Sequence, residues 1–217
     1  MVKSRPYVIL SAAISIDGNM ATKTGDSKLS SKKDLVRVHK LRSNVDAILI
    51  GKRTMMIDDP SLTVRYVKGK NPIRIILDSG GSINSNSKII QTCRKIPTII
   101  AVSEKISEKN IARLQRYGLE VIKCGNKKIN LKKLLSILKK KNINKLLVEG
   151  GGTTNWSFFK NDLVDEIILT LTPFILGGKN AISLVEGDGF SKISQSYPLK
   201  LKNMRRLKNE LVLRYVV

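Results

Sequence analysis

The sequence predicts an α/β fold built on a mixed, mostly parallel sheet. Short apolar runs bounded by turn residues alternate with stretches that carry apolar residues at helical spacing, which is typical of parallel strands joined by helices. The last third differs, because residues 199–203 and 211–217 form two strand candidates separated by a turn-like polar break at 206–210. This pattern favours an antiparallel hairpin at the edge of the sheet.

The elements follow one another in a regular order along the chain. The strand candidates are residues 7–16, 47–50, 73–77, 98–102, 120–123, 145–148, 167–171, 199–203 and 211–217. The helix candidates are residues 31–43, residues 108–117 with Ser107 as the cap, and a Lys-rich helix after Asn130. No linker, repeat or change of composition marks a boundary, so a single domain over 1–217 is expected. The longest irregular stretch, 173–198, is interpreted as a functional or interface loop.

The chain is strongly basic, with 40 Lys and Arg against 17 Asp and Glu among 217 residues and a net charge of +23. Such a charge suits a nucleic-acid binder. Its densest part, 127–141, nevertheless has leucines at 131, 134, 135 and 138, which indicates an amphipathic helix with a solvated Lys face. Aromatic residues make up only 5% and do not interleave with the basic run. Nucleic-acid binding is therefore the less favoured reading, whereas a phosphorylated small molecule would be attracted by this charge.

The cysteine content and the hydropathy narrow the class of protein further. Cys93 and Cys124 lie far apart and outside any C-x-x-C pair, which supports neither a disulfide framework nor a zinc site. The apolar run at 7–16 has no cleavage site after it, and no stretch reaches the roughly 18 apolar residues that a spanning helix needs. A soluble cytoplasmic protein without a metal is expected.

A glycine-rich turn is the first candidate site. Residues 146–156 are predicted to pass from a buried strand through Gly150, Gly151 and Gly152 into a helix. Glycines allow close approach of the backbone to a ligand, and the N-terminus of a helix attracts anions. The turn matches neither the G-x-G-x-x-G fingerprint nor the phosphate-binding loop with its Lys, and a plain tight connection is the alternative. Glu149, a carboxylate at the end of a strand, favours the functional interpretation.

A second constellation follows the strand at 47–50. In residues 51–65, Thr54 and Asp58 are four apart and would share a face if 53–57 is helical. A short helix that ends at Asp-Asp-Pro explains the pattern equally well. Asp17 with Gly18, and Ser27, are each interpreted on their own as structural.

Taken together, six stretches resemble a known family in matching order. They are residues 14–18, 38–42, 51–65, 71–79 and 148–153, and 163–166 with 173–178. The chain resembles the riboflavin-pathway pyrimidine reductases over nearly its whole length, more weakly between about residues 84 and 143. Bacterial members often carry a fused deaminase with zinc signatures, and these signatures are absent from this sequence. Deamination is therefore expected to be carried out by another protein.

The resemblance implies a dihydrofolate-reductase-like fold, with helices on both faces of the sheet, in a homodimer. The implied reaction uses NADPH, with NADH less favoured, to reduce the ribosylamino side chain of a phosphorylated pyrimidine to ribitylamino. The substrate favoured is 2,5-diamino-6-ribosylamino-4(3H)-pyrimidinone 5′-phosphate. A deaminated pyrimidine, or a pterin, remains an alternative.

The resemblance also implies site residues. The cofactor contacts are Ile14, Leu29, Thr54, Asp58, Ser79, Gly150, Gly151, Gly152, Thr153, Thr154, Asn155, Trp156 and Ser157. The substrate contacts are Ser27, Arg42, Leu62, Arg65 and Glu149. No proton donor is assigned, with Asp58 and Glu149 as candidates, and Lys52 or Arg53 are candidates for the 2′-phosphate of NADPH. His39 receives no metal or catalytic role and is expected at the surface.

Overall fold

The computed structural model describes residues 4–217. Contacts divide these residues into two compact units. Unit 1 contains residues 4–7 and His39–Leu147, and unit 2 contains Val8–Val38 and Val148–Val217. Helix α1, Lys32–Ser43, contributes residues to both units. The expectation of a single domain stays a prediction.

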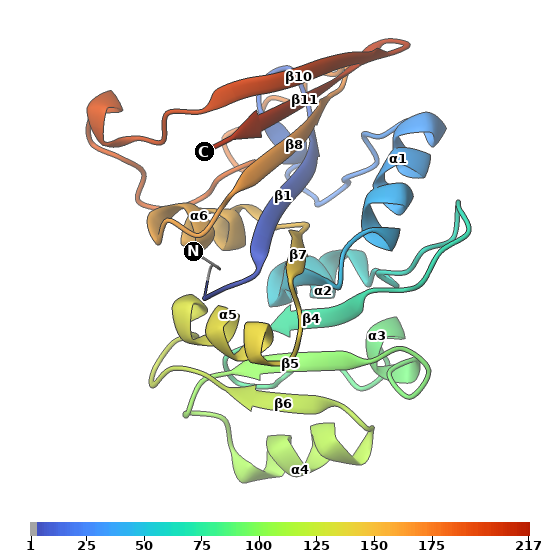
Figure 1. The fold of residues 1–217 in the computed structure, drawn as a ribbon. Helices are drawn as coiled ribbons and strands as arrows, with labels where there is room; N and C mark the ends of the chain where they lie inside the picture. The colour runs from blue at the N-terminus through green and yellow to red at the C-terminus, as the bar shows by residue number, and fades with distance from the viewer. Residues whose placement is uncertain (1–3) are drawn as a thin grey trace. The chain divides into compact units, whose positions relative to one another are not determined.

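Unit 1 is built on a sheet of the order β7-β3-β4-β5-β6. The strands are β3 (Ala47–Gly51), β4 (Ile73–Leu77), β5 (Thr98–Val102), β6 (Glu120–Lys123) and β7 (Lys145–Val148). The pairs β3·β4, β4·β5 and β5·β6 are parallel, and Figure 1 shows β4, β5 and β6 side by side. Every residue of β3 and β5 is buried, as expected for parallel strands covered on both faces.

The helices of unit 1 follow from capping residues and apolar spacing. They are α2 (Lys52–Asp58), α3 (Lys88–Gln91), α4 (Glu108–Arg116) and α5 (Leu131–Lys140). The Ser107 side chain caps α4 and the Asn130 side chain caps α5, each by accepting the backbone N–H three residues on. The four leucines of α5 are buried and Lys132 and Lys133 are exposed, which confirms the amphipathic interpretation of the Lys-rich run.

Unit 2 contains the antiparallel part of the structure. Strand β1 (Tyr7–Ile14) pairs in parallel with β8 (Glu166–Leu171), which pairs antiparallel with β11 (Glu210–Val216). Strand β10 (Lys200–Leu207) pairs antiparallel with β11, and the two form the red hairpin of Figure 1. The predicted mixed sheet and C-terminal hairpin are confirmed. The polar break predicted at 206–210 is wrong in extent, because both strands continue into it and leave only residues 208–209 as the turn.

The remaining elements of unit 2 are short. Helix α6 (Gly152–Lys160) follows the glycine-rich turn, and β2 (Asn19–Ala21) pairs with β9 (Ile182–Ser183). A 3₁₀ turn, Ile193–Gln195, also lies in the stretch expected to be irregular. These small elements and α3 were not predicted, because two to four residues are too few to show a periodicity. Within residues 4–217, no helix is long and apolar enough to cross a membrane.

Candidate functional site

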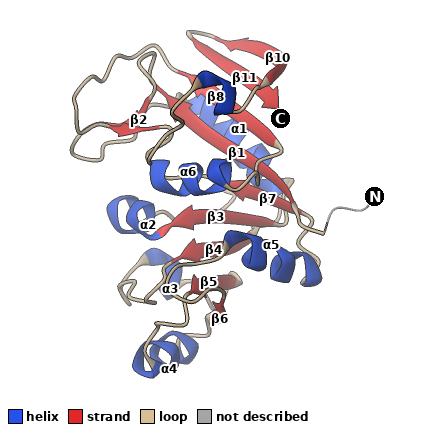
Figure 2. Cartoon of the chain, turned by 90° about the vertical axis from the view of Figure 1, so that its left-hand side faces the viewer, coloured by secondary structure: helices blue, strands red, loops and turns tan. Residues whose placement is uncertain are grey.

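In unit 1, three of the predicted cofactor residues follow two neighbouring strands. Helix α2 begins directly after β3, as Figure 2 shows, and it carries half-buried Thr54 and exposed Asp58. Ser79 lies just beyond β4. The register pairs Gly51 with Leu77. Because β3 and β4 are parallel, α2 and the turn after β4 both lie at the carboxyl ends of these strands. The helix on which the Thr54 and Asp58 prediction depended is confirmed.

The turn after β4 is held by a buried carboxylate. Asp78 is 2% exposed, and its side chain accepts the backbone N–H groups of Gly80 at 3.3 Å and Ile83 at 2.9 Å. The ammonium of Lys52, the first residue of α2, lies 3.8 Å from Asp78 Oδ1. Lys52 thus forms an ion pair with Asp78, and this pair would compete with binding of a 2′-phosphate by Lys52. Asp78 itself was missed, because a single Asp after a strand is common in turns.

Also in unit 1, the predicted substrate residues Arg42 and Arg65 meet at Thr63. Arg42 Nη1 donates to the Thr63 carbonyl at 3.1 Å, and Arg65 Nη1 donates to Thr63 Oγ1 at 2.8 Å. Arg65 is exposed, whereas Leu62 is 2% exposed and has a φ of 50°. A substrate contact of Leu62 would therefore involve its backbone rather than its side chain.

The expectation that His39 lies at the surface is wrong. His39 is 2% exposed, and its Nδ1 accepts the backbone N–H of Arg65 at 2.8 Å. The local sequence around it is basic, but the side chain faces a segment that lies 26 residues further along the chain. A local pattern does not reveal such a partner.

In unit 2, the glycine-rich turn has the features of a ligand cradle. Gly150 has a φ of 95°, and a Cβ placed on it would meet no atom closer than 3.9 Å. Gly151 is the N-cap residue of α6 and, as a glycine, supplies no side-chain cap. Asn155 is fully buried; its Nδ2 donates to the Leu184 carbonyl at 2.7 Å, while its Oδ1 has no partner within residues 4–217. The amide lies beside Gly150, so an unpaired acceptor and open space adjoin each other.

An acidic side chain lies against the first turn of α6. A Cβ on Gly152 would lie 2.5 Å from Glu186 Cγ and 2.7 Å from the Ser183 carbonyl oxygen. Thr153 Oγ1 donates to Glu186 Oε2 at 3.5 Å. Glycine is thus needed at position 152 because Glu186 and the Ser183 carbonyl occupy the space that a side chain would need. The positive end of the helix attracts this carboxylate, as it would attract a phosphate.

Two of the predicted cofactor side chains point elsewhere. Trp156 is 8% exposed and packs edge-on against Phe190 at 5.1 Å, beside an apolar cavity of about 310 Å³ that Phe159 and Tyr197 also line. Ser157 Oγ donates to the Thr153 carbonyl within α6. Any cofactor contact of these two residues would need their backbone or a change of packing.

The other predicted residues of unit 2 are spread over its loops and strand ends. Ile14 ends β1 and is partly exposed, Leu29 is 7% exposed, Ser27 is exposed, and Glu149 follows β7.

Asp17, interpreted as structural, accepts the N–H groups of Leu176 and Gly177. Bonds from the Ser15 hydroxyl, and then from these amides, hold the pKa of Asp17 well below its ordinary value.

Comparison with known proteins identifies the family. The model of the RibD C-terminal domain matches residues 6–213. The chain belongs to this family. It is 39% identical, over 98% of its length and 99% of the relative's, to the 2,5-diamino-6-ribosylamino-4(3H)-pyrimidinone 5′-phosphate reductase of Methanothermobacter thermautotrophicus. It is 38% identical over 92% of its length, and 91% of the relative's, to the protein of the same name from Aquifex aeolicus.

A solved structure agrees with the fold. Acinetobacter baumannii RibD superposes with a TM-score of 0.85 at 27% identity, over 99% of this chain and 58% of that one. The predicted family and the dihydrofolate-reductase-like α/β fold are confirmed. Membership of a reductase family implies a nicotinamide cofactor.

Proposed function

We propose that this protein reduces the ribosylamino side chain of 2,5-diamino-6-ribosylamino-4(3H)-pyrimidinone 5′-phosphate to the ribitylamino form, with NADPH as the reductant. The observation that supports this most strongly is the 39% identity, over almost the full length of both chains, to a reductase named for that substrate. Two free, buried cysteines agree with a reducing compartment, the cytoplasm.

The residues of the glycine-rich turn fit a dinucleotide. Gly150 leaves room for close approach of a ligand, the N-terminus of α6 points N–H groups toward a diphosphate bound there, and Asn155 Oδ1 would accept from a cofactor hydroxyl or amide. In unit 1, Thr54, Asp58 and Ser79 are proposed as further cofactor contacts. When bound, NADPH would supply the hydride for the C1′ carbon of the ring-opened imine. The chain's own task is to bind and orient the reactants.

The exposed guanidinium of Arg65 is proposed to bind the substrate phosphate. Arg42 and Arg65 both donate to Thr63, so Arg42 also supports the backbone next to Arg65, besides any direct contact with the substrate. Ser27 and Glu149 are proposed as further substrate contacts, with Glu149 accepting from pyrimidine N–H groups. The imine nitrogen gains a proton as C1′ gains the hydride, and Asp58 and Glu149 are the candidate donors.

A substrate comparison tests this function. Oxidation of NADPH is followed by the loss of its near-ultraviolet absorbance with the diaminopyrimidinone, its deaminated counterpart and a dihydropterin in parallel. We expect turnover with the diaminopyrimidinone to exceed that with the other two by at least about tenfold, because unpaired polar groups strongly penalise a wrong ring. Preference for either of the others would reassign the substrate.

Glu186 offers a test of the proposed phosphate site. The E186Q variant should bind NADPH about 2- to 5-fold more tightly, because a charge next to the N-terminus of a helix contributes about 0.3–1 kcal/mol. The matched control is D188N, since Asp188 pairs with Lys160 at 3.1 Å, at the other end of α6. Affinities are measured by fluorescence titration. Weaker NADPH binding by E186Q, with D188N unchanged, would instead make Glu186 a cofactor ligand.

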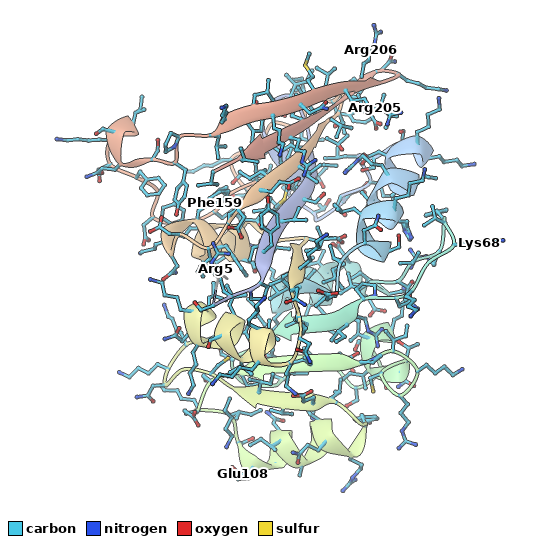
Figure 3. All side chains as sticks on the ribbon, in the orientation of Figure 1. Arg5, Lys68, Glu108, Phe159, Arg205 and Arg206 are labelled. Carbon is cyan, nitrogen blue, oxygen red and sulfur yellow. The ribbon has the colours of Figure 1, made fainter. Side chains whose placement is uncertain are left out.

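We propose that the protein is a homodimer and that the side of the C-terminal hairpin that carries Met204 forms its interface. The register places Met204, Leu213, Leu169 and Ala12 in one row across β10, β11, β8 and β1. Met204 is 61% exposed. Figure 3 labels its neighbours Arg205 and Arg206, which leave β10 on opposite sides, and alternation places Met204 on the side of Arg206. An apolar row that is exposed at Met204 and half-buried at its other three residues supports burial against a second copy.

A charge placed in this row should separate the protomers. M204E is expected to give a monomer by light scattering at micromolar concentration, because each interface would bury two carboxylates without partners. N203E is the matched control, since Asn203 is exposed on the neighbouring position of the same strand and pairs with Arg214. If M204E keeps the mass of the wild type, or if the wild type is itself a monomer, the hairpin is not the interface.

A further inference from the structure

The segment of residues 61–66 is held in place by side chains rather than by regular structure. It belongs to no helix or strand. Side chains nevertheless bond to its backbone at almost every residue. Two arginines donate to carbonyl oxygens: Arg74 Nη1 to that of Ser61 at 3.3 Å, and Arg42 Nη1 to that of Thr63 at 3.1 Å. Two further side chains accept backbone N–H groups: Asn71 Oδ1 that of Val64 at 2.8 Å, and His39 Nδ1 that of Arg65 at 2.8 Å.

Three of the four side chains that hold this segment belong to a helix or a strand. Arg74 lies on β4 and is fully buried, and its guanidinium also donates to Thr92, Thr98 and two backbone carbonyls. Burial lowers the pKa of Arg74 to about 10, so it remains a cation at neutral pH. His39 and Arg42 lie three residues apart on α1 and therefore face the same side of that helix.

His39 makes the contact nearest to the exposed guanidinium. Its Nδ1 accepts the N–H of Arg65 itself and lies 3.4 Å from the N–H of Tyr66. The imidazole is buried and packs edge-on against the Tyr66 ring at 4.6 Å, which fixes its orientation. A nitrogen that accepts a hydrogen bond carries no proton, so His39 acts here through its Nδ1 lone pair.

We propose that His39 is a positioning residue for the reductase: by accepting the Arg65 N–H it fixes the backbone from which the Arg65 guanidinium reaches the substrate phosphate. This inference rests on the proposed function, because it assigns a task to a residue of that same site. Arg65 is then held at both ends, because its backbone N–H donates to His39 Nδ1 and its guanidinium Nη1 donates to Thr63 Oγ1. Two fixed ends reduce the entropy that Arg65 loses when it binds a phosphate.

Two amide substitutions of His39 distinguish the effect of losing the acceptor at Nδ1 from the effect of losing the bulk of the ring. In H39N the amide oxygen falls close to the position of Nδ1, whereas in H39Q the longer side chain carries it past that position, toward that of Nε2. H39Q should raise the KM for the phosphorylated pyrimidine about 5- to 10-fold with kcat and NADPH affinity unchanged, as expected when a binding contact remote from C1′ is weakened. H39N should stay within about 2-fold of the wild type.

Amide hydrogen exchange at Arg65 and Tyr66 gives a readout that does not depend on activity. Faster exchange in H39Q, with protection restored in H39N and a parallel change in KM, is the expected result. If exchange rises in H39Q but KM does not, or if neither changes, His39 does not position Arg65 for the substrate and the proposal is overturned. A rise in KM that is equal in both variants, or a joint fall in kcat, would show a general structural defect and would equally overturn it.

The wild-type protein separates this proposal from the proposed function. If it turns over no pyrimidine, the proposed function fails, and the same three proteins are then compared by calorimetry with ribose 5-phosphate as the probe. The order wild type and H39N above H39Q in affinity would support the positioning of Arg65 for a phosphate. Equal affinities, or no binding by any of the three, would refute it.

Discussion

Replacement of Arg65 by alanine is expected to raise the KM for the phosphorylated pyrimidine by about 10- to 100-fold, because a hydrogen bond to a charged group contributes about 1.5–3 kcal/mol. The NADPH affinity and the fold should not change, since the Arg65 side chain is exposed and bonds within its own segment to Thr63. Steady-state kinetics over a range of substrate concentrations, with NADPH saturating, measures the effect.

Lys68 provides the matched control for this substitution. It is an exposed cation three residues further along the same loop, and Figure 3 shows it extending away from the ribbon. K68A removes the same charge from the surface, so it reports the general attraction of a basic protein for a phosphorylated ligand. A KM for R65A no higher than that for K68A would place the phosphate elsewhere.

The G150V variant is expected to lose about 100-fold or more in NADPH affinity. Gly150 has a φ of 95°, where a β-branched residue is strained by about 1–3 kcal/mol, so the turn must change its conformation. The added side chain would also occupy the open space beside the Asn155 amide. Titration of NADPH fluorescence, together with a thermal melt, measures binding and stability separately.

Gly189 separates the effect of backbone strain from the effect on the cofactor. It lies in unit 2 with a φ of 70°, and a Cβ there would meet nothing within 4 Å. G189V should therefore carry a similar conformational penalty and a similar fall in melting temperature, but unaltered NADPH affinity. Equal losses of affinity in G150V and G189V would mean that the glycine-rich turn does not contact the cofactor.

Much of the fold could be predicted from the sequence because the signals are local. The strands β4, β5, β6 and β7 coincide with the predicted ranges, since each is an apolar run between turn residues. The caps Ser107 and Asn130 and the leucines of α5 are likewise short-range patterns. The hairpin was predicted in type but not in length, because β10 is exposed throughout most of its length and has no apolar alternation to mark its end.

The candidate site was less accessible to sequence reasoning, because its contacts join residues far apart in the chain. His39 sits in a basic helix, and only the fold shows that its Nδ1 holds the backbone of Arg65. The carboxylate of Glu186 beside Gly152 also arises from a loop 34 residues away, and no local motif identifies it. Leu62 is buried at a φ of 50°, a backbone conformation that is rare for leucine and that no local pattern indicates. These are tertiary effects that override local propensity.

Transfer of deuterium from NADPH tests the central claim most directly. The protein is incubated with the diaminopyrimidinone phosphate and NADPH that is deuterated at both positions of nicotinamide C4, and the product is analysed by mass spectrometry and NMR. Reduction of the ring-opened imine predicts a ribitylamino product that carries one deuterium, bound to C1′. Consumption of NADPH with deuterium at another carbon, or binding of NADPH without any reduction of the pyrimidine, would contradict the proposed reaction.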